Sequence, residues 1–197
     1  MIGKQPKNNE IKIKAEFRDQ IHNAIPTQYM RSAGVSPYFI PIFGNWYWKR
    51  LQIVLELSKL YASKKELNIG DFGCGFGIFV SLLSIEFNSK IIGVDTYPLE
   101  VLKVAKDLCD KFSGNNNYSF IRADIENLPF RSETFDLCFC LDVLEHVPNV
   151  ATSLGEIKRV LNEDGILIVS VPVESQILKI IREIYTLKGR LGDNNPH

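Results

Sequence analysis

The strongest constraint on the fold is the stretch at residues 67–77, which contains three glycines at alternate positions. A short apolar run ends at Asp71, Gly73, Gly75 and Gly77 follow, and an apolar pattern with helical spacing comes next. This order predicts a strand, a tight turn and a helix. Glycine permits positive φ and has no Cβ, so a ligand can lie against the backbone where the next helix presents unpaired N–H groups. The stretch is therefore predicted to bind a nucleotide or a cofactor.

Beyond this turn, short apolar runs alternate with amphipathic segments as far as residue 171. This alternation is typical of βαβ units and predicts a doubly wound α/β fold with a mostly parallel sheet. The predicted strands are 67–72, 90–94, 118–123, 136–141 and 165–171. The predicted helices are 76–87, 98–112, 150–161 and 175–185. In a doubly wound order the first strand lies in the middle of the sheet, and ligands bind at the carboxyl ends of the strands.

The first third of the chain has a different pattern. Apolar residues at helical spacing predict a helix within 11–25, and residues 26–45 form an aromatic-rich loop or lid. A second helix over 46–62 would be capped by Asn45 and cover the sheet. We expect an N-terminal helical and lid segment, a cofactor-binding α/β core, and a C-terminal helix and tail, with bounds at 1–65, 66–173 and 174–197.

Composition is that of an ordinary globular protein, with 45% hydrophobic and 23% charged residues, so disorder is not expected. No apolar run is long enough to span a membrane, and the N-terminus lacks the apolar core of a signal peptide. A cytoplasmic location is predicted. The four cysteines show no C-x-x-C pair and no histidine at ligand spacing, which predicts reduced core thiols and no metal site.

The segment from Asp71 to Gly77 has the form Asp-x-Gly-x-Gly-x-Gly. It resembles the first motif of the class I S-adenosylmethionine-dependent methyltransferases, in particular the small-molecule branch with the ubiquinone-type enzymes (methyltransferase type 11). The dinucleotide fingerprint G-x-G-x-x-G would require a glycine at position 78, where the chain has Ile78. Two later segments carry the same resemblance. Asp124 precedes Leu-Pro-Phe at 128–130, and Leu-Glu-His occupies 144–146.

The resemblance implies S-adenosylmethionine as cofactor, with S-adenosylhomocysteine as product. Asp95 would accept hydrogen bonds from the ribose hydroxyls, a role that a nicotinamide cofactor would also assign to it. Thr96 and Tyr97 would lie against the adenine ring, Asp124 would accept from the adenine amino group, and Ile125 would pack on the ring.

Backbone carbonyls near the end of the fourth predicted strand would receive the ammonium of the cofactor, together with the carbonyl of Gly73. Leu141-Asp142 lies at that strand end, beside the ends of the other strands. The predicted cofactor-binding residues are Asp71, Gly73, Cys74, Gly75, Gly77, Asp95, Thr96, Tyr97, Asp124, Ile125, Cys140 and Leu141.

His146 follows this crevice and is the candidate catalytic base, since its unperturbed pKa lies near neutral pH. The alternative is a histidine that makes only structural hydrogen bonds. In the family the segment before the first motif often closes over the substrate, which gives Tyr29, Arg31, Tyr38, Phe39 and Trp46 as candidate substrate residues or as ordinary core. The acceptor is predicted to be a small molecule with an unknown O, N or C nucleophile.

Residues 1–65 carry eleven Lys and Arg against four Asp and Glu, so an anionic acceptor could be attracted to this segment. Solvated helix faces are the alternative explanation. Nucleic acid is not the expected substrate, because the sequence contains no arginine-rich run and no recognised RNA or DNA module.

Two alternatives to a methyltransferase stay open at this point. A non-catalytic cofactor-binding or partner-binding domain would use the same turn, and a NAD-dependent oxidoreductase is disfavoured by Ile78, Asp71 and Asp124. Family members continue through two further strands after the fifth, so residues 166–171 would form an exposed sheet edge. We expect either a truncated chain or cover from a second subunit in a homodimer or from the C-terminal helix.

Overall fold

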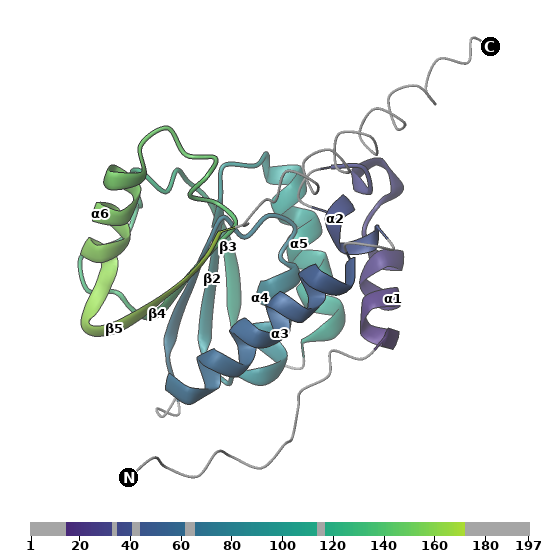
Figure 1. Ribbon diagram of the computed structural model, residues 1–197, viewed down its shortest axis with the longest axis horizontal. Helices are drawn as coiled ribbons and strands as arrows, with labels where there is room; N and C mark the ends of the chain where they lie inside the picture. Colours follow the sequence, from purple (N-terminus) through teal and green to yellow (C-terminus); the bar gives the residue numbers. More distant parts are fainter. Residues whose placement is uncertain (1–14, 33–34, 41–43, 62–65, 114–116, 172–197) are drawn as a thin grey trace.

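The sheet has five parallel strands in the order β3-β2-β1-β4-β5, with β1 at its centre (Figure 1). The computed structural model describes residues 15–32, 35–40, 44–61, 66–113 and 117–171. The strands are β1 (Asn68–Phe72), β2 (Lys90–Asp95), β3 (Tyr118–Arg122), β4 (Phe135–Leu141) and β5 (Leu161–Ser170). The predicted fold class and the central place of the first strand are confirmed.

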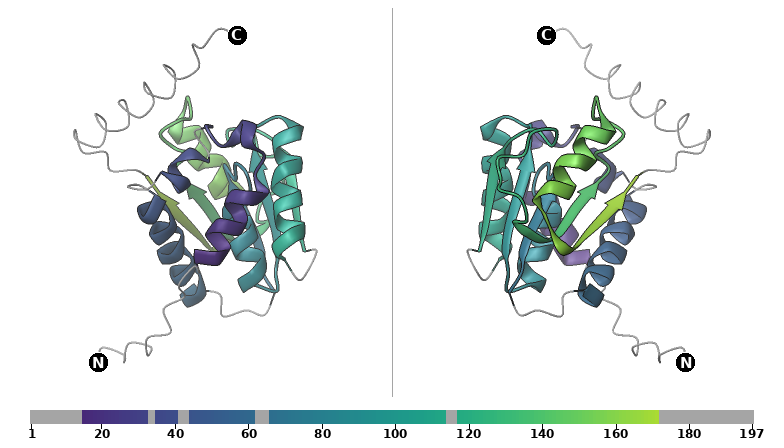
Figure 2. Two further views of the ribbon diagram at one scale, coloured as in Figure 1. Left: turned by 90° about the vertical axis from the view of Figure 1, so that its right-hand side faces the viewer. Right: turned by 90° about the vertical axis from the view of Figure 1, so that its left-hand side faces the viewer.

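Helices cover both faces of the sheet (Figure 2). They are α1 (Ala15–Ala24), the 3-10 turn η1 (Thr27–Tyr29), α2 (Ser36–Phe39), α3 (Gly44–Tyr61), α4 (Ile78–Glu86), α5 (Leu99–Phe112) and α6 (Val150–Val160). One face packs against α1, α3, α4 and α5, and α6 covers the other. None of the helices in the described residues is long and apolar enough to cross a membrane.

Alternation along the strands divides the core into two layers. On β4, Leu137 and Phe139 join the apolar cluster beneath α3, α4 and α5, whereas Cys138 and Cys140 join the cluster beneath α6. All four cysteines are free and buried. The prediction of reduced core thiols is confirmed, and no group of described residues could hold a metal ion.

Most predicted elements lie within a few residues of the observed ones, but two boundaries were wrong. Asn45 does not cap α3, because this helix already begins at Gly44. A Cβ at Gly44 would lie 2.4 Å from the carbonyl oxygen of Tyr38, so glycine is required for this tight corner between α2 and α3.

The second difference concerns the start of β5. The strand begins at Leu161, directly after α6, instead of at a glycine turn ending at residue 165. An irregularity accommodates the additional residues, since Phe135 pairs with Leu161 whereas Leu137 pairs with Ile166. In the described part of the chain β5 is an edge strand, as predicted for residues 166–171. The predicted helix at 175–185 lies outside the described residues.

Candidate functional site

The glycine turn after β1 is fixed against β2 by backbone hydrogen bonds. The N–H groups of Gly73 and Cys74 donate to the carbonyl of Val94 over 2.7 and 3.0 Å. Gly73 has a φ of 82°, and a Cβ there would lie 2.1 Å from Cγ2 of Val143. Gly75 also has positive φ, but a Cβ on it would meet no atom within 4 Å. The turn is therefore tightly packed at its first glycine and open above its second.

Asp95 joins this turn to the loop after β2. Its Oδ2 accepts a hydrogen bond from the N–H of Gly75 at 2.7 Å, and its Oδ1 accepts from the N–H of Tyr97 at 3.0 Å. Each carboxylate oxygen has a further lone pair, so both can still accept from a ligand hydroxyl. The structure thus brings the predicted ribose-binding acid into contact with the glycine turn.

Asp71 lies beneath the turn with only 2% of its surface exposed. Burial, together with the nearby negative charge of Asp95, raises the pKa of Asp71 to about 7. Burial and the charge of Asp71 also raise the pKa of the Cys74 thiol, which keeps this cysteine protonated and unreactive. A cationic ligand group over the turn would favour the ionised form of Asp71.

Aromatic rings connect the N-terminal segment to the turn. The ring of Phe76 lies 5.3 Å from that of Tyr29 and 5.8 Å from that of Tyr97. Tyr29, predicted to contact substrate, therefore reaches the cofactor turn. Thr96 is exposed, and its carbonyl accepts a hydrogen bond from Arg122.

The loop after β3 contains the two residues predicted to contact adenine. Asp124 is exposed and accepts a hydrogen bond from the N–H of Glu126 at 2.9 Å. Ile125 is 7% exposed and belongs to the apolar cluster beneath α6. Their contacts with an adenine ring stay a prediction.

The loop after β4 is held by side chains from distant parts of the chain. Asp142 follows Leu141 with a φ of 56°, and its N–H donates to the carbonyl of Ser170. The Ser170 hydroxyl donates to one carboxylate oxygen of Asp142 at 3.0 Å, and Arg50 of α3 forms an ion pair with the other. The end of β4 is therefore tied to both α3 and β5.

Arg50 also contacts two tyrosines. Its guanidinium lies 4.7 Å from the centre of the Tyr47 ring and hydrogen-bonds the hydroxyl of Tyr38. Burial raises the pKa of Tyr38 to about 12, so this phenol stays protonated. Sequence analysis missed Arg50, whereas Tyr38 was among the candidate substrate residues. The available signal was the position of Arg50 four residues before Val54, on a helix face that is otherwise apolar.

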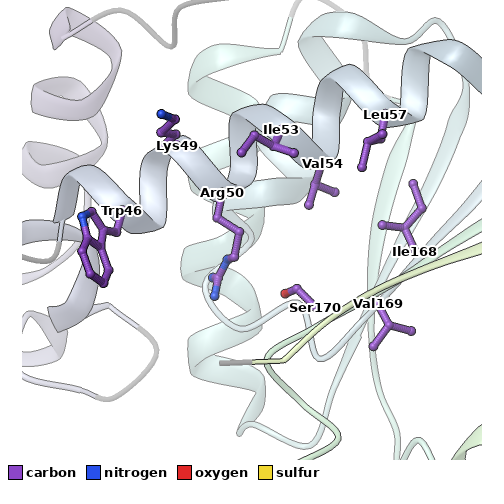
Figure 3. Close-up of a pocket in the computed structure, with 9 residues that line it drawn as sticks. All are labelled: Trp46, Lys49, Arg50, Ile53, Val54, Leu57, Ile168, Val169 and Ser170. Atoms are coloured by element: carbon purple, nitrogen blue, oxygen red, sulfur yellow. The ribbon is translucent and has the colours of Figure 1, made fainter. Parts of the chain in front are cut away.

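Three other predicted residues, His146, Arg31 and Trp46, lie on separate segments of the chain. His146 is exposed, and its backbone N–H donates to the carbonyl of Val143. Arg31 is exposed on the segment after η1. Trp46 lies at the start of α3, where it lines a groove together with Arg50 (Figure 3). The structure thus joins Asp95 to the glycine turn and brings Tyr29 and Tyr97 onto Phe76, and the common cofactor site of the remaining predicted residues stays a prediction.

Comparison with known proteins gives a consistent result. Residues 70–169 match the family model described as a methyltransferase domain. The chain is 36% identical over 124 residues to an uncharacterised protein of Methanocaldococcus jannaschii, which covers 62% of this chain and 48% of that protein. It is 35% identical over 130 residues to the ubiquinone/menaquinone biosynthesis C-methyltransferase UbiE of Campylobacter jejuni, covering 63% and 51%.

A solved structure of a protein from Bacillus halodurans, described as a putative methyltransferase, superimposes with a TM-score of 0.53 at 25% identity. The match covers 66% of this chain and 56% of that one. The chain therefore spans about half the length of the curated relatives that it matches. These similarities favour the methyltransferase prediction over a nicotinamide enzyme.

Proposed function

This chain belongs to the methyltransferase-domain family, whose cofactor is S-adenosylmethionine, and from that premise we propose that it transfers a methyl group to a small-molecule acceptor. The observation that carries the proposal is the arrangement of Asp95 and Gly75. The carboxylate of Asp95 is held by the glycine turn, and the space above Gly75 is open. A nucleoside with two adjacent hydroxyls fits such a site, because the carboxylate can accept from both.

The proposal gives a role to several of the predicted residues. Asp95 binds the ribose hydroxyls, and Tyr97 offers an aromatic face to the adenine. The methionine part of S-adenosylmethionine is cationic. It would be stabilised by the negative charge of Asp71 and by the carbonyls of Gly73, Cys140 and Leu141. Bound S-adenosylmethionine supplies an electrophilic methyl group, whose bond to sulfur breaks as its bond to the acceptor forms, leaving S-adenosylhomocysteine.

The remaining task of the protein is to position the acceptor and exclude water. An O–H acceptor must also lose a proton. We assign this role to His146, the histidine nearest in sequence to the end of β4, with no acceptor atom specified. A non-catalytic cofactor-binding domain would keep the cofactor site and lack turnover, so turnover with any acceptor separates the two possibilities.

Calorimetric titration of S-adenosylmethionine, S-adenosylhomocysteine and NAD tests the proposal. Asp95→Ala is the informative variant, and Asp107→Ala, which changes an exposed aspartate on α5, is the matched control. Loss of the ribose hydrogen bonds is expected to cost about 2 to 3 kcal/mol, roughly a 30- to 150-fold weaker affinity. The control variant should bind both sulfur compounds as the parent protein does.

Two results would contradict the proposal. The first is a folded parent protein that binds neither sulfur compound, and the second is tighter binding of NAD than of S-adenosylhomocysteine. Equal affinities of the Asp95→Ala variant and the parent protein would instead remove Asp95 from the site.

A further inference from the structure

The second half of the loop between β3 and β4 is held to α6 by charged side chains of that helix. Glu156 accepts a hydrogen bond from the N–H of Leu128 at 2.9 Å, and Arg159 donates to the carbonyls of Leu128 and Phe130 at 3.0 and 2.7 Å. Arg159 also donates to both carboxylate oxygens of Glu156. Leu128 is 3% exposed and packs in the apolar cluster beneath α6. This half of the loop therefore has a fixed position on the helix.

The first half of the loop fixes the carboxylate of Asp124. Its Oδ1 accepts a hydrogen bond from the N–H of Glu126 at 2.9 Å, and its backbone carbonyl accepts from the N–H of Asn127 at 3.0 Å. These two bonds fold residues 124–127 into a turn that sets the direction of the Asp124 side chain. Among the described residues none binds Oδ2 of Asp124, so this oxygen is available to the amino group of a purine.

The side chain of Glu126 joins this turn to the residues that follow β4. Glu126 is half-buried, and its Oε1 accepts a hydrogen bond from the backbone N–H of Asn149 at 2.7 Å. Asn149 precedes α6 and ends the stretch 142–149, which we call the β4–α6 segment. Glu126 thus contacts Asp124 through its N–H and the end of the β4–α6 segment through its carboxylate.

The start of α6 does not need Glu126 as a cap. Oδ1 of Asn149 accepts a hydrogen bond from the N–H of Thr152 at 3.1 Å, and the carbonyl of Asn149 accepts from the N–H of Ser153 at 3.0 Å. Asn149 therefore caps the helix with its own side chain. The bond between Glu126 and the N–H of Asn149 lies just before the helix, where it fixes the end of the β4–α6 segment.

The other end of the β4–α6 segment contacts the glycine turn. Val143 packs so closely on Gly73 that a Cβ there would lie 2.1 Å from its Cγ2. The carbonyl of Val143 accepts a hydrogen bond from the N–H of His146 at 2.8 Å. The segment that carries His146 is thus held at one end by the glycine turn and at the other by the loop that contains Asp124. The position of His146 depends on both contacts.

We propose that Glu126 is a positioning residue, which aligns Asp124 with the adenine amino group and makes the position of the β4–α6 segment depend on the base that is bound. The inference rests on the proposed methyl transfer, and it adds a link between recognition of the cofactor and the segment with the candidate catalytic base. If Glu126 contributed only to stability, its removal would leave the preference among nucleosides unchanged.

A comparison of S-adenosylhomocysteine with S-inosylhomocysteine tests the alignment, because the second compound has an oxygen in place of the adenine amino group. In calorimetric titrations the parent protein should bind S-adenosylhomocysteine at least tenfold more tightly. Glu126→Ala should reduce this preference about fivefold, since one hydrogen bond that positions the turn is lost.

Two further variants make this result specific. Glu126→Gln should keep most of the preference, because its amide oxygen can still accept from the N–H of Asn149. Glu163→Ala is the matched control, since Glu163 is exposed near the start of β5, at the opposite edge of the sheet from the loops discussed. This control variant should keep the preference of the parent protein.

Hydrogen exchange of the Asn149 amide, followed by NMR, tests the link to the β4–α6 segment. In the parent protein, saturating S-adenosylhomocysteine should slow this exchange at least threefold more than saturating S-inosylhomocysteine, because only the adenine amino group donates to Asp124. In Glu126→Ala the Asn149 amide has lost its acceptor, so the two ligands should give the same exchange rate.

The outcomes separate this inference from the function on which it rests. Binding of S-adenosylhomocysteine with a base preference that Glu126→Ala does not change overturns the inference and leaves methyl transfer standing. Equal affinities of the parent for the two nucleosides, or equal protection of the Asn149 amide by both, also overturn it. If Glu126→Ala does not fold, the exchange measured in the parent protein decides. A folded parent protein that binds neither compound overturns the proposed function itself.

Discussion

At the ends of β1 and β2 the candidate site is built from backbone, whereas at the ends of β4 and β5 it is built from side chains. The first region uses glycines with positive φ and N–H groups that bind Val94 and Asp95. The second region depends on Arg50, Asp142 and Ser170. A backbone site tolerates few substitutions but can be recognised in a short motif, and a side-chain site is assembled from residues that no motif connects.

The largest effect is expected when one methyl group is added to the backbone region. Gly73→Ala combines a φ of 82° with a clash against Val143, so it should lower the free energy of unfolding by about 3 kcal/mol and abolish binding of S-adenosylhomocysteine. Urea unfolding and calorimetry measure the two effects.

Gly155→Ala provides the control for this variant. Gly155 lies within α6 with no atom near its added Cβ, so alanine there should stabilise the protein by up to about 1 kcal/mol. Combining Gly73→Ala with Val143→Ala should recover part of the loss. A Gly73→Ala protein as stable as the parent would show that the turn is not constrained as described.

A second test concerns the buried charge beneath the backbone region. Because the pKa of Asp71 is raised from its ordinary 3.8 to about 7, the folded protein holds this proton more tightly than the unfolded chain. Stability contributed by the proton is fully present below about pH 4 and is lost as the pH rises to about 7.

Asp71→Asn should remove this loss. Relative to the parent, the variant should gain up to about 1.4 kcal/mol of stability per pH unit between pH 4 and 7, with little further change above that. Urea unfolding at several pH values measures the difference in unfolding free energy between variant and parent. For the control variant Asp107→Asn, which changes an exposed residue, this difference should not depend on pH. A flat difference for Asp71→Asn would mean that Asp71 is ionised at ordinary pH.

The third test measures the side-chain region. Arg50 and Asp142 are 25% and 18% exposed, so a double-mutant cycle of Arg50→Gln and Asp142→Asn should give a coupling of about 1 to 2 kcal/mol. The pair Lys106 and Asp110 on α5 is 59% and 44% exposed and should show a much weaker coupling, because solvent screens both charges. Equal couplings in the two cycles would show that Arg50 is not a structural part of the site.

The same contrast explains what could be predicted from the sequence. Asp71, the glycines and Asp95 were found because local spacing fixes both the turn and its distance from the second strand. The central place of the first strand followed from the βαβ pattern and its handedness. The early start of β5 was missed because it depends on an irregular pairing with β4 that leaves no local pattern.

Arg50 was missed for a related reason. Nothing in the sequence near Arg50 indicates a partner 92 positions away, and a basic residue on a helix is usually solvated. Trp46 was predicted to contact substrate, which stays a prediction, and its neighbours became known only from the packing of α3 on β5.

The large separation of Arg50 and Asp142 along the chain also affects the order in which parts of the protein fold. Asp95 lies 20 positions from Gly75, so their contact closes a short loop, whereas the ion pair closes one of 92 positions. Longer closures carry a greater entropic cost and form more slowly. We therefore expect the contact between Asp95 and the glycine turn to form before the groove beside Arg50 when the chain refolds. The same order is expected in a newly synthesised chain.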